Sequence, residues 1–345
     1  MPHQVTLQPS GHQFTVEDDE TILEAALREG FSLPYGCRNG ACGACKGKVL
    51  SGLLDHGAHS PNALKDEDKA QGRALFCRAR PLSDMVIEAR EIGAARDIVV
   101  KTLPCRVEKL EKRADDVMVM KIKLPANERL QYLAGQYIDF QLKGGKSRSY
   151  SLANPPHDDA LLELHIRHVP GGLFTDQVFS TLKERDILRL KGPLGSFFIR
   201  EDSDKPMIFI AGGTGFAPIK GMLEHAFAER TDRDLVLYWG VRSLKDLYMA
   251  ELPQQWLAEH PNFSFIPVLS QPEPGDRWQG RTGLVHEAVL ADFADLSGYQ
   301  VYACGAPAMV DSAREAFTQT RGLPEDEFFA DAFVYAADAE TAPAV

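Results

Sequence analysis

Three cysteines of this 345-residue chain lie close together in the stretch YGCRNGACGACKGKV, residues 35–49. Cys37, Cys42 and Cys45 follow the spacing C-x4-C-x2-C, and Cys77 comes later in the chain. Four thiolates with this spacing hold [2Fe–2S] clusters. The first residues show no basic and apolar export signal, so we expect a cytoplasmic protein, in which clustered thiols bind metal or do chemistry rather than form disulfides. The spacing therefore predicts a redox centre on these four residues.

Small residues surround these cysteines, and this composition suits a buried anionic cluster. Thiolates and cluster together are negatively charged, so their burial requires hydrogen-bond donors nearby. Glycine and alanine let the backbone come close enough to direct N–H groups at sulfur. A zinc site is the alternative, but zinc sites favour two C-x2-C pairs, and this stretch has one. The small residues in question are Gly36, Gly40, Ala41, Gly43 and Ala44.

A second group of chemically capable residues lies in RSYSLANPP, residues 148–156. On a strand, Arg148 and Tyr150 project to one face and Ser151 to the other. A guanidinium suits a flavin phosphate, an aromatic ring can stack on a flavin or a ribose, and a hydroxyl can hydrogen-bond the edge of the isoalloxazine. Taken alone, this motif is equally compatible with an ordinary edge strand.

The stretch LHIRHVPGGLFT, residues 164–175, strengthens the flavin interpretation. Gly172 permits a close approach of the backbone to a ligand, and Thr175 is placed to bond a pyrophosphate at the start of a helix. Two histidines here could be metal ligands, but His165 and His168 on a barrel strand are more typical of structural residues. The candidate cofactor-binding residues of this stretch are His165, Arg167, Gly172, Phe174 and Thr175.

A glycine-rich turn follows an apolar run in MIFIAGGTGFAPIKGML, residues 207–223. Gly212, Gly213 and Gly215 allow the backbone to approach a pyrophosphate, while Thr214 and the first N–H groups of the following helix supply donors. The turn is not G-x-G-x-x-G. Its place between a strand and a helix nevertheless indicates a nucleotide phosphate site.

Another cysteine lies near the C-terminal end, in VYACGAPAMV, residues 301–310. This pattern places Cys304 at the carboxyl end of an apolar strand, and parallel sheets bind ligands at that edge. We therefore expect Cys304 to face the nucleotide, with a plain buried thiol as the alternative. Cys105, alone on an apolar strand, is expected to be a small buried hydrophobe.

The pattern of strands and helices changes along the chain and divides it into units. A small α+β pattern surrounds the cysteines, and in it Thr21 caps a helix that stops at Gly30. Alternating strands with Gly and Pro turns then predict an antiparallel β-barrel, and apolar strands alternating with helices predict a parallel sheet. The predicted boundaries are 1–92 for the α+β unit, 93–103 for a linker, 104–200 for the barrel, 201–335 for the α/β unit and 336–345 for a disordered tail.

The distribution of charge narrows the classes of partner. Residues 1–95 carry 10 basic and 13 acidic side chains, residues 96–200 carry 18 and 13, and residues 201–345 carry 10 and 23. A nucleic-acid-binding protein needs a concentrated basic face, and a membrane span needs an apolar run of about 18 residues. We therefore expect neither a nucleic-acid nor a membrane partner.

Residues 1–92 resemble a plant-type ferredoxin domain, with TILEAAL before the cysteine loop and LFCRARP around the fourth cysteine. The ordered motifs RSYSLANPP, LHIRHVPGGLFT and GPLGSFF resemble the FAD domain of the ferredoxin–NADP⁺ reductase superfamily. This resemblance implies FAD rather than FMN, because FMN-using relatives tend to carry the ferredoxin domain at the C-terminus.

The same resemblance implies roles for residues of the last third of the chain. In this superfamily a turn of the form C-G-x-P-x-M touches the nicotinamide, and its thiol lies near the reactive carbon. Catalytic roles then fall to Cys304 and Ser151, while Phe333, in EFFADAFV, covers the flavin face. The residues assigned to the nicotinamide site are Cys304, Gly305, Pro307 and Met309.

The choice between NADH and NADPH depends on the charge near the adenosine ribose. A 2′-phosphate favours Arg or Lys there, and Arg242 and Lys245 keep NADPH open. Gln271, however, stands where NADPH-using relatives commonly have Arg, and the net negative charge of residues 201–345 opposes an extra phosphate. The sequence favours NADH.

The resemblance implies an enzyme that passes electrons from NADH to FAD, then to the [2Fe–2S] cluster, and then singly to a protein partner. Motifs over nearly the whole chain are similar to those of CDP-6-deoxy-Δ3,4-glucoseen reductases, whose partner is a sugar dehydrase. Reductase components of Rieske dioxygenases and diiron monooxygenases share the motifs, so an oxygenase component is the alternative partner. A nonenzymatic, zinc-stabilised nucleotide-binding module is the alternative of a different class.

Overall fold

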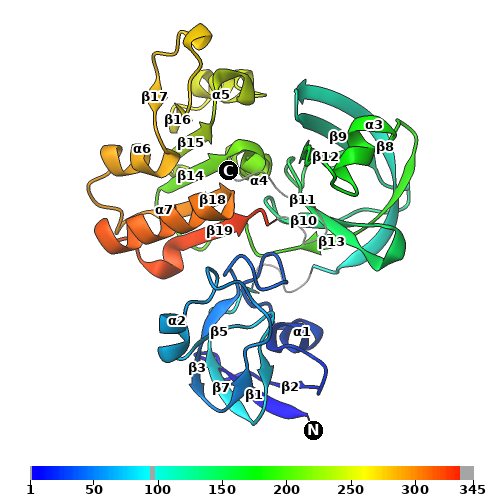
Figure 1. Ribbon diagram of the computed structural model, residues 1–345, viewed down its shortest axis with the longest axis vertical. Coiled ribbons are helices and arrows are strands. Elements are labelled where there is room, and N and C mark those ends of the chain that lie inside the picture. Colours follow the sequence, from blue (N-terminus) through cyan, green and yellow to red (C-terminus); the bar gives the residue numbers. More distant parts are fainter. Residues whose placement is uncertain (1, 94–97, 335–345) are drawn as a thin grey trace. The chain divides into compact units, whose positions relative to one another are not determined.

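The computed structural model describes residues 2–93 and 98–334 of the chain. They form two compact units, drawn in Figure 1. The first contains the residues up to 98 together with the short segment 195–197. The second contains residues 99–194 and the residues from 198 onward. The segment 195–197, although distant in sequence, thus belongs with the cysteine-containing unit.

The first unit is built on a mixed β-sheet with the strand order β2-β1-β7-β3-β5. Strand β1 pairs with β2 in an antiparallel hairpin and with β7 in parallel. Ile22 and Leu23 of helix α1 are buried with Val5 and Leu7 of β1, so the helix packs on the sheet. The predicted α+β, β-grasp arrangement is confirmed. Its elements are β1 (His3–Gln8), β2 (Gln13–Val16), α1 (Ile22–Arg28), β3 (Lys46–Ser51), β4 (Leu54–Asp55), α2 (Asp66–Ala70), β5 (Arg73–Leu75), β6 (Arg80–Pro81) and β7 (Met85–Glu88).

Helix α1 begins where the sequence predicts, because Thr21 caps it. The Thr21 hydroxyl accepts a hydrogen bond from the backbone N–H of Glu24 at 3.3 Å, and the Glu24 carboxylate accepts one from the backbone N–H of Thr21 at 2.9 Å. A cap of this kind stabilises a helix by about 1 kcal/mol. Gly30, with a φ of +84°, ends the turn after the helix. The chain then runs into the cysteine loop.

An antiparallel β-barrel forms the first part of the second unit, as predicted. Its strand order is β11-β10-β13-β8-β9-β12, and a bridge between Leu152 and Leu164 joins the two ends of this order and closes the sheet. Ile138, Phe140 and Ile166 lie in its buried core. The elements are β8 (Lys101–Ala114), β9 (Val117–Lys123), β10 (Tyr137–Gln141), β11 (Ser147–Ser151), β12 (Leu162–Arg167), α3 (Thr175–Ser180) and β13 (Ile187–Leu194).

A parallel sheet with the order β17-β16-β15-β14-β18-β19 forms the rest of the second unit. Neighbouring strands in this order pair in parallel. Figure 1 shows α6 and α7 together on one face of the sheet and α4 on the other, where Phe227 of α4 contacts Trp256 of α5. The elements are β14 (Met207–Gly212), α4 (Phe216–Ala228), β15 (Leu235–Val241), α5 (Glu251–Glu259), β16 (Phe263–Leu269), β17 (Arg281–Thr282), α6 (Val285–Asp292), β18 (Gln300–Gly305), α7 (Pro307–Thr320) and β19 (Phe328–Ala332).

Two of the predicted boundaries, those of the linker and of the C-terminal tail, can be compared with the residues that the structure describes. Strand β8 begins at Lys101, inside the segment predicted to be a linker. Residues 94–97 of that linker and the predicted tail, 336–345, lie outside the described residues. The division of residues 93–103 into linker and barrel therefore stays a prediction.

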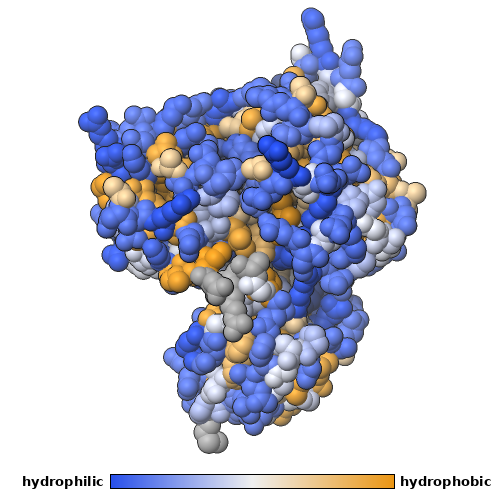
Figure 2. All heavy atoms as spheres, turned by 180° about the vertical axis from the view of Figure 1, so that it is seen from behind, coloured by the Kyte–Doolittle hydropathy of each residue, from blue (hydrophilic) through white to orange (hydrophobic). Residues whose placement is uncertain are grey.

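The surface of the described residues is mostly polar. Figure 2 shows one face, on which hydrophilic side chains predominate and apolar side chains are scattered. Scattered apolar side chains are normal on protein surfaces. Among the described residues, helices that are both long enough and apolar enough to cross a bilayer are absent.

Candidate functional site

The four cysteines predicted to hold a cluster come together as two pairs in the first unit. Cys37 and Cys42 form one pair, in which the backbone N–H of Cys37 points at the Cys42 sulfur at 3.4 Å. Cys45 and Cys77 form the other pair, in which the two thiols are hydrogen-bonded. Negative charge on Cys37 also acts on Cys77, so the two pairs are neighbours. One segment therefore supplies three thiols, and the turn after β5 supplies the fourth.

In each pair one thiol is favoured in its charged form, while the hydrogen bond to that thiol and burial raise the pKa of its partner, Cys42 or Cys45, well above the usual value. The hydrogen bond from Cys42, together with backbone N–H groups of Asn39 and Ala41, lowers the pKa of the Cys37 thiol to about 6 against the opposing effect of burial. The hydrogen bond from Cys45 lowers the pKa of Cys77 below its usual value. Backbone donors directed at sulfur are what an anionic cluster needs. The surroundings of the four cysteines thus fit the group that their spacing predicts.

The two-pair arrangement fits two iron ions better than a single zinc ion. In a [2Fe–2S] cluster each iron takes two cysteine thiolates, whereas a structural zinc takes four ligands around one point. Gly40 lets the cysteine loop pack closely on its neighbours, because an added Cβ would lie 2.8 Å from the Arg78 side chain and 3.1 Å from the Ala58 carbonyl oxygen.

A second set of functional groups lies where the barrel meets the parallel sheet inside the second unit. Ser151 ends β11, and its buried hydroxyl donates to the Asp331 carboxylate at 3.3 Å. Asp331 on β19 is the register partner of Cys304 on β18. Burial, and then the charge of Asp331, raise the pKa of the Cys304 thiol well above its usual value. Ser151 and Cys304, both predicted to be catalytic, thus lie on either side of Asp331.

Asp331 is a residue that the sequence analysis missed. The signal was present in FFADAFV, where a carboxylate interrupts an otherwise apolar strand. Buried carboxylates are uncommon unless they are partnered or functional. Only the pairing of β18 with β19 reveals that this carboxylate lies beside Cys304.

The aromatic residues predicted to hold a flavin also lie together. The ring centroids of Tyr150 and Phe174 are 5.5 Å apart, and both rings contact Phe140. Arg148 lies on the same strand as Tyr150. Burial raises the pKa of the Tyr150 phenol, which stays neutral. A guanidinium, an aromatic ring and a buried hydroxyl on one strand are the donors and stacking surface that a flavin phosphate and ring require.

Thr175 and Gly172, predicted to contact a pyrophosphate, make contacts within the turn that precedes α3. The Thr175 hydroxyl donates to the Val169 carbonyl oxygen at 2.9 Å and accepts from the Val169 N–H at 3.2 Å. A Cβ added at Gly172 would lie 2.5 Å from the Thr175 hydroxyl, so this turn requires glycine. Contacts of these two residues with pyrophosphate stay a prediction.

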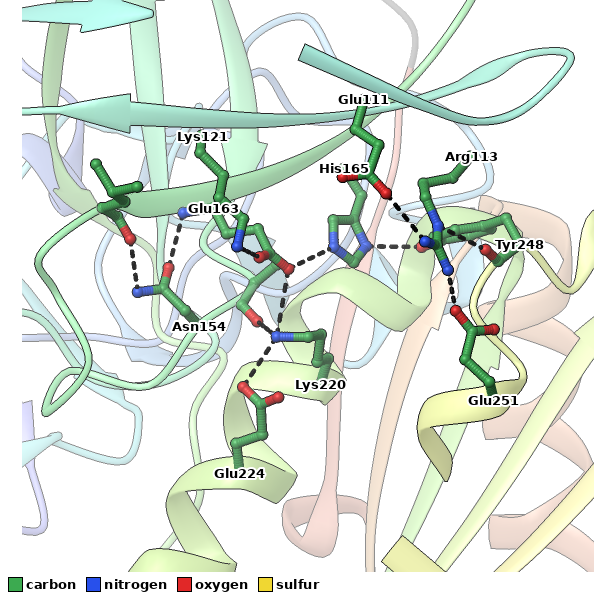
Figure 3. Close-up of polar contacts among 12 residues, drawn as sticks. Glu111, Arg113, Lys121, Asn154, Glu163, His165, Lys220, Glu224, Tyr248 and Glu251 are labelled. Atoms are coloured by element: carbon green, nitrogen blue, oxygen red, sulfur yellow. Dashed lines mark hydrogen bonds and ion pairs between the residues drawn. The ribbon is translucent and has the colours of Figure 1, made fainter. Parts of the chain in front are cut away.

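The histidines of β12 and the following loop have protein partners, as expected for structural residues, and a contact of His165 with a cofactor stays a prediction. Figure 3 shows the His165 ring between Tyr248 and Glu163, and its two nitrogens lie 2.8 Å and 3.0 Å from their oxygens. His168 pairs with Asp176 at 2.8 Å. Both histidines therefore serve the structure. Burial is the physical reason for His165, because a buried imidazole needs partners for both nitrogens.

The backbone of the glycine-rich turn packs directly against the backbone at the end of β18. A Cβ added at Gly215 would lie 2.1 Å from the Cys304 carbonyl oxygen. A Cβ at Gly212 would lie 2.6 Å from the Met309 sulfur, and one at Gly305 would lie 3.0 Å from the Gly212 Cα. These glycines thus pack two strand ends together, a reason that the sequence analysis did not give.

The remaining predicted residues of the nucleotide site flank this contact. Gly213 lies against Arg167, whose guanidinium would be 2.8 Å from an added Cβ, and Thr214 is buried in the turn. Pro307 is the first residue of α7. The backbone N–H of Phe333 donates to the Gly305 carbonyl oxygen at 2.8 Å. The C-G-x-P-x-M turn, the glycine turn and Phe333 therefore form one continuous group.

Comparison with known families bears on all three parts of the chain. Residues 5–82 match the 2Fe-2S iron-sulfur cluster binding domain. Residues 104–199 match the oxidoreductase FAD-binding domain, and residues 209–315 match the oxidoreductase NAD-binding domain.

Relatives match over the whole length of the chain. A CDP-6-deoxy-L-threo-D-glycero-4-hexulose-3-dehydrase reductase of Yersinia pestis is 41% identical over 330 residues, which cover 96% of this chain and 98% of the relative. The phenol hydroxylase P5 protein of Acinetobacter pittii is 39% identical over 343 residues, which cover 98% and 96%. The crystal structure of Amycolatopsis cytochrome P450 reductase GcoB matches with a TM-score of 0.75 and 36% identity, and covers 96% of this chain and 98% of that one.

The chain belongs to the ferredoxin reductase family. This reductase has domains for NAD, FAD and a [2Fe–2S] cluster, and its function is electron transfer. When bound, FAD accepts electrons in pairs and releases them singly, whereas the cluster carries them one at a time. The four thiols would hold the cluster, and Arg148, Tyr150 and Ser151 would hold the flavin. Ser151, Asp331 and Cys304 are buried where the barrel meets the sheet.

Proposed function

We propose that this reductase takes electrons from NADH at the group of Ser151, Asp331 and Cys304 and delivers them from the four-cysteine loop to a protein acceptor. The observation that carries this proposal is the presence of two separate, chemically different sites in one chain. The first is a buried site with a neutral thiol beside the nucleotide turn. The second is a loop of paired thiols with backbone donors.

The charges at the carboxyl ends of β15 and β16 support NADH over NADPH. The Lys245 ammonium, which would attract a 2′-phosphate, lies 2.7 Å from the Glu273 carboxylate. The Asp246 carboxylate accepts from Ser243, and the Asp276 carboxylate accepts from the N–H of Leu244 at 3.2 Å. Carboxylates near the ribose favour a free 2′-hydroxyl. Of the two cations that keep NADPH open in the sequence, Lys245 is therefore paired with an anion.

Replacement of Glu273 tests this preference. In Glu273→Gln, Lys245 loses its partner, and we expect the ratio of kcat/KM for NADH to that for NADPH to fall about two- to fivefold, the size of an exposed charge pair. Glu259→Gln, at the end of α5, removes a charge next to the opposite end of β16 and should leave the ratio unchanged. Wild-type protein that oxidises NADPH as readily as NADH would contradict the proposal.

The acceptor we propose is a sugar dehydrase of the kind that serves the CDP-6-deoxy-hexulose system. The support is the 41% identity to a dehydrase reductase over nearly the full length of both chains. A second candidate, an oxygenase component, is favoured by the 39% identity to the phenol hydroxylase P5 protein over a similar length. The two relatives differ too little in identity to separate the acceptors.

Reconstitution separates the two acceptors. The reduced protein is mixed with a pyridoxamine-phosphate sugar dehydrase, a diiron hydroxylase or a Rieske oxygenase, and product formation per NADH oxidised is measured. We expect tight coupling with the dehydrase and little product with the oxygenases. Coupled turnover with an oxygenase alone would replace the first candidate by the second.

A further inference from the structure

A buried lysine joins the helix after the glycine turn to the barrel. Lys220 lies on α4, and its ammonium is 2.9 Å from the carboxylate of Glu224 on the same helix. The same ammonium is 3.3 Å from the Glu163 carboxylate on β12 and donates to the Ala153 carbonyl oxygen at 3.1 Å. Figure 3 shows these contacts converging on the lysine. The ammonium therefore links two parts of the barrel to one helix of the parallel sheet.

Glu163 is held as an anion by groups on three sides. Its carboxylate lies 3.1 Å from Lys121 of β9, 3.0 Å from the His165 ring and 3.3 Å from Lys220. Burial acts to raise the pKa of Glu163, but the hydrogen bond from His165 and the nearby cations outweigh it and hold that pKa below the usual range. A charged, buried carboxylate fixes its partners in direction and distance more strictly than an exposed one.

Ala153, whose carbonyl oxygen accepts the hydrogen bond from Lys220, lies two residues after Ser151 in the chain. The Ala153 N–H donates to the Glu163 carbonyl oxygen at 2.8 Å while the Ala153 carbonyl oxygen accepts from Lys220. A Cβ added at Gly221 would lie 3.1 Å from the Asn154 carbonyl oxygen, so α4 rests against this segment without intervening atoms. Helix α4 begins at Phe216, directly after the glycine turn and shortly before Lys220.

We propose that Lys220 is a positioning residue that fixes the distance between the glycine turn and Ser151, and thereby the alignment of nicotinamide with flavin. This inference rests on the proposed function. NADH gives a hydride, two electrons with one proton, to oxidised FAD, so the products are NAD⁺ and the two-electron-reduced flavin anion. The described contacts of the Lys220 ammonium are with Glu163, Glu224 and Ala153. It acts through Ala153 on one side and through α4 on the other.

Alignment is the property that such a link controls. Hydride transfer needs the two reacting atoms at about 3–3.5 Å, and a misplacement of about 1 Å can slow a reaction roughly 100-fold. Loss of the link should therefore lower the limiting rate of flavin reduction and leave the affinity for each cofactor nearly unchanged. A merely structural role would lower cofactor content or stability instead.

The test compares Lys220→Met with Lys121→Met. Both variants remove a lysine that pairs with Glu163, but Lys121 lies on β9 within the barrel and makes no link to α4 in the contacts described here. Flavin reduction is followed by rapid mixing with NADH without oxygen, over a range of NADH concentrations. We expect the limiting rate of Lys220→Met to fall at least about tenfold with an NADH Kd within about twofold of wild type. Lys121→Met should reduce its flavin at close to the wild-type rate.

Two further variants separate position from stability. Lys220→Arg keeps the charge and a donor, so it should regain most of the rate. Glu163→Gln with Lys220→Met removes both buried charges, and this should restore the unfolding midpoint lost in Lys220→Met. It should not restore the rate, because the donor to Ala153 is still missing. Recovery of the rate in this double variant would overturn the inference.

Hydrogen exchange gives a readout that does not depend on activity. In FAD-free protein, the amide of Ala153 should exchange about tenfold faster in Lys220→Met than in wild type or Lys121→Met. Unchanged exchange together with an unchanged rate would overturn the proposal. If wild-type protein fails to oxidise NADH, the proposed function fails, and the exchange comparison still decides whether Lys220 holds this segment.

Discussion

Three buried residues, Ser151, Asp331 and Cys304, determine the protonation and the hydrogen bonding of the buried group in the second unit. The Cys304 thiol stays protonated because burial and the nearby Asp331 carboxylate raise its pKa. The Ser151 hydroxyl is directed by its hydrogen bond to Asp331. In the proposed function, the nicotinamide and the flavin would meet a neutral thiol and an oriented hydroxyl, with the Asp331 carboxylate as the charge beside both.

Cys304→Ala is expected to slow flavin reduction by NADH about 10- to 100-fold, because the nicotinamide loses the side chain that borders it. The measurement is the rate of flavin bleaching after rapid mixing. Cys105→Ala is the matched control, since burial raises the pKa of Cys105 to about 12 and its thiol lies on β8 of the barrel. Equal slowing in both variants would mean that Cys304 serves packing alone.

A pH effect on stability is expected from His165. Burial lowers the pKa of His165 below the usual 6.5, although Glu163 opposes this shift. The folded protein therefore binds this proton less readily than the unfolded chain, and the free energy of unfolding should fall as the pH drops below about 6.5. Glu163 has a lowered pKa, so its contribution is lost only below its usual value of 4.5.

Denaturant unfolding at pH 7.5 and pH 5.5 measures this effect. Wild-type protein should lose more stability between these two values than His165→Gln, in which the titrating imidazole is absent. His157→Gln is the control, because the His157 side chain is exposed and lies outside this network. The same pH dependence in wild type and His165→Gln would contradict the assignment.

At the residue scale, the sequence predicts groups with fixed spacing and misses groups that long-range pairing creates. The cysteine spacing, Ser151 and Cys304 are visible because a motif carries each of them. Asp331 and Lys220 are not visible, since one depends on the pairing of β18 with β19 and the other on the contact of α4 with the barrel. The burial of His165 between Glu163 and Tyr248 is likewise a tertiary feature that the sequence does not show.

At the scale of elements, local signals predict most of the fold. The Thr21 cap of α1, the alternating strands of the barrel and the apolar strands of the parallel sheet were predicted and are confirmed. Strand β17 was not predicted, because two residues carry no periodicity. Strand β19 was quoted only as an aromatic segment, since its place at the sheet edge depends on pairing with β18.

The glycine turn gives a prediction about an element. In Gly215→Ala the new Cβ would meet the Cys304 carbonyl oxygen, a backbone atom that cannot turn aside. We expect a loss of about 1–3 kcal/mol in the free energy of unfolding and weaker NADH binding, measured by denaturant unfolding and by titration. Gly298→Ala, where an added Cβ meets nothing within 4 Å, should be close to neutral. A stable Gly215→Ala protein with normal NADH binding would show that the turn tolerates a shift.

At the scale of the whole molecule, the two units divide the work. The second unit contains the FAD-binding and NAD-binding domains, and the first unit contains the 2Fe-2S domain with the four cysteines. Cys42→Ser should abolish electron transfer to a one-electron protein acceptor and spare the reduction of ferricyanide by NADH, because ferricyanide can take electrons from the flavin. Both activities are assayed on the same preparation after its FAD content is measured. If both vanish while FAD stays bound, the proposed order of electron transfer is wrong.

The central claim is that electrons enter as a pair at the second unit and leave singly from the first. Anaerobic titration of the purified full chain with NADH tests it most directly, with absorbance for flavin and cluster and electron paramagnetic resonance for the reduced cluster. We predict that the flavin and the cluster both bleach and that a [2Fe–2S] signal grows as NADH is added. A protein whose flavin bleaches while its cluster stays oxidised, or that contains neither iron nor flavin, would contradict the claim.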